Sequence, residues 1–298
     1  MTMRIAGILL VLSLGWVAAC GEPAVDDTER AVLMEECHPD CGGSIFVFNH
    51  AALVLPDENG HVRGWNFDGI VNEDGGREGC YTVDHVSPDG EKGIDNQFAN
   101  FLPALGAESG EAIEDAVPLL LENAIHDGGI LILTEIFGSD DWSNADSVGI
   151  GFRRGTGIPL LGTDGSMLQA QTFSLHEEPW MGGNNDISIV DGVIDDTAGD
   201  LAMAITVFGV EYRFTLRQSR FEFEIAPDGS SISGILGGLV PTSDVVTIGE
   251  QIEDRDLGAL VSLLGPALAD VRSEEDGPCD LISAVVEFSG IPAFVYPE

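Results

Sequence analysis

The feature that most restricts the fold of this chain is a recurring pair, aspartate or asparagine followed by glycine, set between short apolar runs. The pair occurs at Asn59-Gly60, Asp164-Gly165, Asp191-Gly192 and Asp228-Gly229. Type I′ turns need positive φ at both central residues, and these residue types reach it at the lowest cost. Each pair therefore predicts a β-hairpin, and together they predict a β-rich, mostly antiparallel body.

The apolar runs beside these turns have the length of strands. Their ranges are 44–55, 130–137, 147–153, 187–190, 201–208, 211–216, 221–225 and 281–295. Side chains alternate between the two faces of a strand, so Tyr212, Phe214 and Leu216 share one face. Phe221 and Phe223 continue the alternation with the opposite parity. Because a change of parity needs an extra residue or a turn, we expect a bulge between residues 216 and 221.

Two helical pairs are expected to interrupt the strands. In the first pair, Asp95 can cap a helix with apolar residues at 98, 101, 102 and 105, and a second helix follows Ser109. Near the end of the chain, Ser243 and Asp256 precede apolar residues at helical spacing, which predicts two further caps. The fold class predicted is therefore α+β and β-rich: an antiparallel sandwich or partly open barrel with two packed helical pairs, in one domain over residues 43–298.

The first twenty residues have the layout of an export signal. A start with one positive charge, Arg4, leads into an apolar run over residues 5–17 that is too short to span a bilayer comfortably. The run ends in Val17-Ala18-Ala19-Cys20, which resembles the lipobox of bacterial lipoproteins. The resemblance implies a signal peptide over residues 1–19, diacylglycerol on Cys20 with an acyl chain such as palmitate on the new amine, and an acylated tether over residues 20–42. An ordinary signal peptide with a chance cysteine is the alternative.

Two weaker resemblances concern the location of the protein in the cell and its similarity to other secreted proteins. Gly21, rather than aspartate, follows Cys20, which resembles lipoproteins that a two-membrane cell sends on to its outer membrane. Residues 90–105 together with 282–293 are faintly similar to uncharacterised secreted proteins of social or predatory soil bacteria, and this likeness implies no activity. The expected location is the cell envelope, lipid-anchored at the outer membrane.

The charge of the chain excludes some partners. With 12 basic and 51 acidic residues the formal net charge is −39, and removal of residues 1–19 takes away Arg4 and no acid, which leaves −40. So acidic a protein repels nucleic acid and anionic lipid headgroups and attracts divalent cations. Nucleic acid is therefore not an expected partner, and contact with the membrane is expected through the lipid anchor.

Four cysteines remain after Cys20, and an even number in an exported chain predicts two disulfides. They are Cys37, Cys41, Cys80 and Cys279, which allow three connectivities. We favour Cys37 with Cys41 and Cys80 with Cys279. A metal site built from Cys37, His38 and Cys41 is the alternative.

The densest polar stretch, residues 66–96, is the candidate for a metal site. Calcium takes six to eight oxygen ligands from carboxylates, amides and backbone carbonyls of a flexible loop. The candidate ligands are Asp84, Asp89, Glu91, Asp95 and Asn96. The spacing does not follow the EF-hand loop, so composition alone supports Ca²⁺ as a cofactor. A solvated loop with Asp95 as a helix cap is the alternative.

No catalytic motif is found, so no residue is assigned a catalytic role. The chain lacks Gly-x-Ser-x-Gly, and the run His176-Glu177-Glu178-Pro179-Trp180 departs from His-Glu-x-x-His where proline would break the helix. The predicted function is a lipid-anchored envelope protein acting as a non-catalytic binding or structural module for a glycan or protein ligand, stabilised by calcium. The alternative is a secreted hydrolase acting on glycans through paired carboxylates.

Overall fold

The computed structural model describes residues 43–109, 113–139, 141–207 and 209–296. The chain divides into two units, Met1–Asp40 and Cys41–Glu298, and the described residues all belong to the second. The expected signal peptide, Cys20 and the tether lie outside the described residues. Strands account for 49% and helices for 17% of the structure, which confirms the β-rich α+β class.

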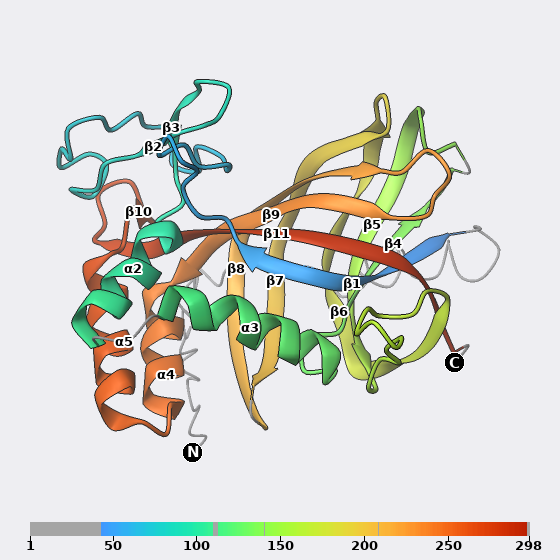
Figure 1. The fold of residues 1–298 in the computed structure, drawn as a ribbon. Coiled ribbons are helices and arrows are strands. Elements are labelled where there is room, and N and C mark those ends of the chain that lie inside the picture. Colours follow the sequence, from blue (N-terminus) through green and yellow to red (C-terminus); the bar gives the residue numbers. More distant parts are fainter. Residues whose placement is uncertain (1–42, 110–112, 140, 208, 297–298) are drawn as a thin grey trace, which may run out of the picture. The chain divides into compact units, whose positions relative to one another are not determined.

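Nine strands form one large mixed sheet, and two short strands form a second sheet (Figure 1). The strands of the large sheet are β1 (Ser44–Leu53), β4 (Ile132–Phe137), β5 (Ala145–Thr156), β6 (Gln171–Ile189), β7 (Val193–Val207), β8 (Val210–Ile225), β9 (Ile232–Pro241), β10 (Val271–Arg272) and β11 (Cys279–Val295). Their order is β1-β4-β5-β6-β11-β9-β8-β7, with β10 beside β11. β1 also pairs with β11, so β1, β4, β5, β6 and β11 close a ring of strands. The β6–β11 pairing is parallel, which makes the sheet mixed.

Two of the four predicted turns join consecutive strands of the large sheet, and the other two lie inside loops. Asp191 and Gly192 both have positive φ, 51° and 83°, and join β6 to β7 as predicted. Asp228-Gly229 joins β8 to β9. The hairpin prediction is wrong at Asn59-Gly60, which forms a turn inside a loop, whereas at Asp164-Gly165 a minimal hairpin is present, because Leu161 and Met167 form an isolated antiparallel bridge on either side of the turn. At the first of these, the Asp57 carboxylate accepts backbone hydrogen bonds that close the turn without any strand pairing.

The predicted bulge in β8 is confirmed. Gln218 has a φ of 48°, and the pairing with β9 shifts between Arg217 and Arg220. The shift restores the inward direction for Phe221 and Phe223, which are 0% and 1% exposed. One extra residue thus keeps both halves of a sixteen-residue strand apolar on the core side.

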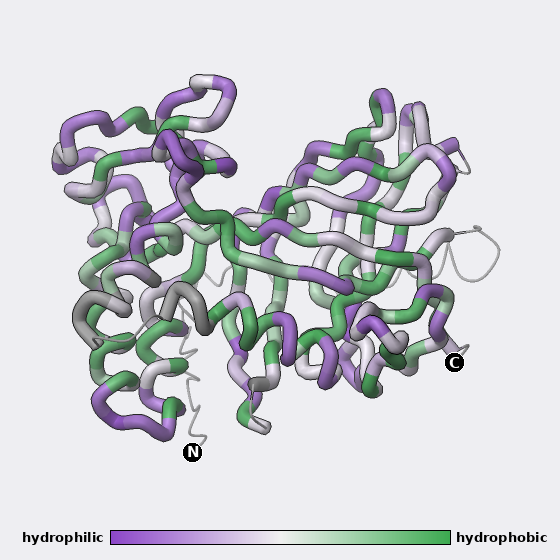
Figure 2. Tube along the Cα trace, in the orientation of Figure 1, coloured by the Kyte–Doolittle hydropathy of each residue, from purple (hydrophilic) through white to green (hydrophobic). Residues whose placement is uncertain are grey.

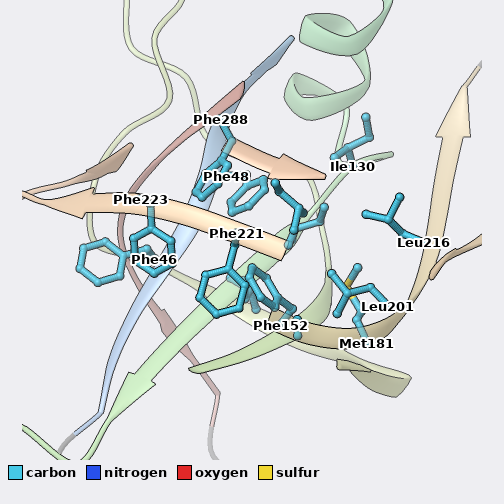
Figure 3. Close-up of a cluster of buried hydrophobic side chains, with 14 of the residues drawn as sticks. Phe46, Phe48, Ile130, Phe152, Met181, Leu201, Leu216, Phe221, Phe223 and Phe288 are labelled. Carbon is cyan, nitrogen blue, oxygen red and sulfur yellow. The ribbon is translucent and has the colours of Figure 1, made fainter. Parts of the chain in front are cut away.

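The main core lies against one face of the sheet and is rich in phenylalanine (Figure 3). The rings of Phe48 and Phe288 stack with their centroids 4.4 Å apart, and Phe288 meets Phe223 edge to face at 5.9 Å. Phe152 and Phe221 extend the cluster at 5.5 Å. Because these five rings come from β1, β5, β8 and β11, the core joins strands from both the ring and its extension.

Both predicted helical pairs are present. They are α2 (Phe98–Ser109) with α3 (Ile113–His126), and α4 (Thr242–Gln251) with α5 (Arg255–Ala267). Both predicted caps of the second pair are wrong. The Asp254 side chain, not that of Asp256, accepts from the first backbone amides of α5. α4 begins directly after Pro241 with no side-chain cap, because β9 runs straight into the helix, so Ser243 does not cap it.

Besides the short strands β2, β3 and β10, the prediction lacks β9 and the first part of β6, and both of these contain glycine. In β9, a side chain at Gly234 would come within 2.0 Å of the Glu222 carbonyl oxygen, and one at Gly238 within 2.7 Å of Leu216. Glycine is usually depleted in strands, but here it allows close approach of neighbouring chains. The first part of β6 contains Pro179 and several polar residues. Along its whole length, the pairing of β6 with β5 is irregular at four points.

Residues 54–97, which we call the cover segment, contain the small sheet of β2 (His85–Val86) and β3 (Lys92–Ile94). The segment is mostly hydrophilic, unlike the strands (Figure 2). Its apolar residues Val54, Val62 and Trp65 pack with Ile235 and Val285 on the sheet face away from the main core. In the part of the chain that the structure describes, no helix is long and apolar enough to cross a membrane.

Candidate functional site

Cross-strand register gathers polar side chains on the sheet face that the cover segment partly occupies. Directly paired residues of neighbouring strands point to the same face, and β1, β11, β9 and β8 are paired in that order. One row across these strands reads His50, Ser289, Ser233 and Glu224, and the next reads Ala52, Glu287, Ile235 and Glu222. Neighbouring residues along the same strands, such as Phe223 and Phe288, point into the main core.

The two rows line a groove of about 420 Å³, which we call the carboxylate groove. Its polar lining residues are His50, Arg63, Glu222, Glu224, Ser233, Glu287 and Ser289. Three carboxylates face one guanidinium and one imidazole, so acidic groups outnumber basic groups in the groove. Because the side chains stand on paired strands rather than on loops, their relative positions are set by the backbone of the sheet.

The ionic contacts in the groove are loose and exposed. His50 Nε2 lies 4.0 Å from Glu287 Oε1, with side-chain exposures of 55% and 52%. Arg63 approaches Glu222 Oε1 to 3.5 Å and is similarly exposed. Exposed pairs of this kind contribute about 0–1 kcal/mol to stability. The carboxylates are therefore not needed to hold the fold together, and they stay accessible to a ligand.

The cover segment forms one end of the groove. Arg63 belongs to this segment, and two residues later Trp65 is buried against the sheet. A side chain at Gly237 would lie 2.9 Å from the Trp65 ring, so this glycine makes room for the indole. The guanidinium of Arg220 lies 5.4 Å from the ring centroid on the same face. The indole is 8% exposed and fills a core position, which does not offer a stacking surface for a sugar.

A second polar cluster joins the cover segment to the strands and centres on Asp95. The Asp95 carboxylate accepts from the backbone amides of Phe67 at 2.6 Å and Asp68 at 3.3 Å. Asp95 therefore does not cap α2 as predicted; it holds a distant loop. Burial, followed by the negative charges of Asp68 and Asp270, raises the pKa of Asp95 to about 8.

Asp270 is the other deeply buried acid of this cluster. Its carboxylate accepts from the backbone amide of Ser283 at 2.8 Å and from the Ser283 hydroxyl. The same hydroxyl oxygen accepts from the backbone amide of Gln97, just before α2. Burial raises the pKa of Asp270 to about 7 despite these hydrogen bonds. Asp270 was not singled out from the sequence, although an acid between Ala269 and Val271 was a possible signal of burial.

The five predicted calcium ligands lie in different surroundings. Asp84 accepts from the Asn72 amide, Asp89 from the Ser87 hydroxyl, and Glu91 is exposed next to β3. The Asn96 side chain donates to the Val54 carbonyl at 3.0 Å, and its Oδ1 has no partner. Among the described residues, no three or more His, Cys, Asp or Glu side chains are grouped as a metal site. Calcium binding stays a prediction.

One predicted disulfide is confirmed. Cys80 and Cys279 are bonded, which ties the cover segment to the start of β11. Close to this bond, Arg272 donates to the backbone carbonyls of Arg77 and Glu78. Cys37 and Cys41 lie outside the described residues, so their pairing stays a prediction, as does the alternative metal site with His38.

The remaining aromatic and histidine candidates lie within strands or pack against glycines, and they do not form a recognisable site. His176-Glu177-Glu178-Pro179-Trp180 lies within β6, so these residues are not arranged as a helical zinc motif. The Trp180 ring lies over Gly151, and the Trp142 ring lies beside Gly229.

No family model, curated protein or solved structure matches this chain. Function is therefore inferred from the geometry of the described residues.

Proposed function

We propose that this chain is a lipid-anchored protein of the cell envelope whose folded domain is a non-catalytic binding module. The observation that carries the proposal is the carboxylate groove, where Glu222, Glu224 and Glu287 are set by strand register around a hollow of about 420 Å³. Anchoring at Cys20 and location at the outer membrane rest on the lipobox-like sequence. The anchor would hold the domain at the membrane, and the groove would take the ligand.

The chemistry of the groove defines the class of ligand. Carboxylates accept hydrogen bonds and attract positive charge, and at an exposed site each ionic contact contributes up to about 1 kcal/mol. The hydroxyls of Ser233 and Ser289 can donate or accept, which suits a ligand with hydroxyl groups. We therefore propose a ligand with spaced amino groups, such as an amino-sugar glycan or a lysine-bearing segment of a protein.

Binding is favoured over glycoside hydrolysis for a physical reason. Glu222 and Glu287 stand two strands apart, about 9–10 Å between backbones from the spacing of strands, which alone would suit an inverting pair. Hydrolysis also needs one acid that keeps its proton near neutral pH. The acids whose pKa burial raises to about 7 and 8, Asp270 and Asp95, are not among the groove residues.

A hexamer of glucosamine tests the proposal by titration calorimetry. The variant Glu222→Gln/Glu224→Gln/Glu287→Gln should bind at least about tenfold more weakly, which corresponds to about 1.4 kcal/mol and is within reach of three exposed ionic contacts of up to about 1 kcal/mol each. The matched control substitutes three exposed glutamates outside the groove, Glu177, Glu178 and Glu250, and changes the net charge equally.

The control decides between a defined site and general attraction to an acidic protein. If both triple variants lost the same affinity, the ligand would be held by net charge and the groove would not be the site. If the wild-type protein cleaved the hexamer and the groove variant did not, the hydrolase alternative would replace the binding module.

A further inference from the structure

We propose that a charge-poor apolar surface at one end of the sheet docks onto the zwitterionic lipid surface that holds the anchor. We call this surface the apolar end; it consists of the loop at residues 157–170 and of residues 294–296, at the end of β11 and directly after it. Its exposed large side chains are Ile158, Leu160, Leu161, Leu168, Phe294 and Tyr296. The proposal rests on the proposed anchoring at Cys20, and adds which face of the domain meets the membrane.

The apolar end is exposed although its backbone is ordered. Ile158 is 75% and Leu160 64% exposed. The Gln171 side chain donates to the carbonyls of Leu160 and Leu168 and accepts from the Leu160 amide, while the Ala170 amide donates to the Pro292 carbonyl. The loop thus presents apolar side chains in a fixed arrangement, and little ordering would be needed when they dock.

Strand pairing joins the loop and the C-terminal strand into one surface. Phe294 pairs with Thr172 in the parallel β6–β11 contact, and Tyr296 donates its backbone amide to Phe173. Ile158, Leu160 and Tyr296 line one shallow hollow of about 370 Å³. Figure 1 shows the yellow-green loop beside the C-terminal end of β11. Contiguous apolar surface of this kind marks contact sites with proteins or membranes.

Charge selects lipid rather than a second copy of the chain. About one residue in five is charged in the whole chain, yet Asp164 is the only charged residue in residues 155–175 and 288–296. Two chains of net charge near −40 would repel each other on approach, whereas a zwitterionic lipid surface carries no net charge. Tyrosine is enriched at the membrane–water boundary, because its ring is apolar and its hydroxyl polar, and Tyr296 has this character.

The position at which the chain enters the domain also supports docking of the apolar end onto the membrane. Gly43 and Ser44 share a hollow of about 250 Å³ with Phe294 and Val295, so the residues after the tether start at the apolar end. The 20–42 segment could reach up to about 80 Å if fully extended, so the anchor alone does not fix how the domain faces the membrane. Once the chain is anchored, docking is intramolecular, and a weak apolar contact suffices.

Depth-dependent fluorescence quenching in the acylated full chain tests the proposal. Leu160→Trp places a reporter on the apolar end, and Leu263→Trp places one at a matched leucine of α5 that is 69% exposed. Both are reconstituted into phosphatidylcholine vesicles with brominated acyl chains, and the emission of the unsubstituted protein is subtracted. For Leu160→Trp only, we expect weaker tryptophan emission in brominated lipid than in ordinary lipid, and a blue shift of the emission on binding to vesicles.

Three other outcomes would overturn the proposal. Equal emission in brominated and ordinary lipid for Leu160→Trp, with the protein still sedimenting with vesicles, would refute docking and leave the anchor intact. Equal emission in the two lipids, together with chemical cross-linking between copies of the chain, would assign the apolar end to self-association. Failure of both variants to sediment with vesicles, with no acyl group found by mass spectrometry, would refute the anchoring and the docking together.

Discussion

Substitution of Asp95 by asparagine isolates the energetic role of the buried acid under the cover segment. The folded protein holds a proton on Asp95 up to a pKa of about 8, because burial and the charges of Asp68 and Asp270 disfavour the carboxylate. The unfolded chain loses that proton near the ordinary value of 3.8. Between these values unfolding releases a proton, so the contribution of Asp95 to the free energy of unfolding is greatest below pH 4 and is lost as the pH rises to about 8.

The magnitude follows from the proton count. One group that is protonated only in the folded state lowers the free energy of unfolding by about 1.4 kcal/mol for each pH unit. From about pH 5 to about pH 7, Asp95 therefore costs about 2.7 kcal/mol, and Asp270, with a pKa of about 7, adds a similar loss. Asparagine resembles the protonated acid and can still accept from Phe67, so Asp95→Asn should remove about half of this loss.

Denaturant unfolding at constant ionic strength measures the effect. Asp146→Asn, an exposed position, makes the same change in net charge and is the control. We expect the stability advantage of Asp95→Asn over the wild type to grow by about 1.4 kcal/mol per pH unit across this interval, and that of Asp146→Asn to stay nearly constant. Parallel pH profiles for the wild type and Asp95→Asn would show that Asp95 is ionised in the folded protein, and would refute the reasoning.

Three further predictions concern the anchor, the metal and the disulfide. Cys20→Ser should abolish palmitate labelling, and a variant that still fractionated with membranes and labelled would contradict the lipobox resemblance. Millimolar calcium should raise the melting temperature and chelator should lower it, with Asp89→Ala/Asp95→Ala removing the response; an equal effect of magnesium at matched ionic strength would assign it to screening. Cys80→Ala/Cys279→Ala should lose about 2–5 kcal/mol in denaturant unfolding, because the bond closes a loop with a sequence separation of 199 residues; an unchanged midpoint would contradict this.

Local patterns in the sequence are sufficient to predict much of the fold. Alternation in residues 211–225 predicts β8 and its bulge, and Asp191-Gly192 predicts the β6–β7 turn, because both signals lie within a few residues. β9 is not predicted, because its glycines are explained by neighbours such as Leu216 and Trp65 that are distant in the sequence. The prediction of Asp95 as a helix cap is wrong for the same reason, since its partner Phe67 lies 28 residues away.

The carboxylate groove could not be predicted in this way. Glu222 and Glu224 stand on the polar face of a recognisable strand, and this alternation is visible in the sequence. Their grouping with Glu287 and His50 depends on the register of β1, β11, β9 and β8, which come from opposite ends of the chain. Acids are so frequent in this sequence that no pair stands out until the strands are aligned.

The buried acid and the groove are connected through the cover segment, so one last prediction follows. The Asp95 backbone amide donates to the Trp65 carbonyl at 2.9 Å, and two residues earlier Arg63 reaches Glu222 at the edge of the groove. Because burial makes ionisation of Asp95 unfavourable, we expect the ionised form to loosen the segment and to move Arg63 away from that edge. We expect the affinity for the glucosamine hexamer to change between about pH 6 and about pH 8 in the wild type more than in Asp95→Asn. Because the charge of the probe varies identically for both proteins, equal pH profiles would show that the cover segment does not act on the groove.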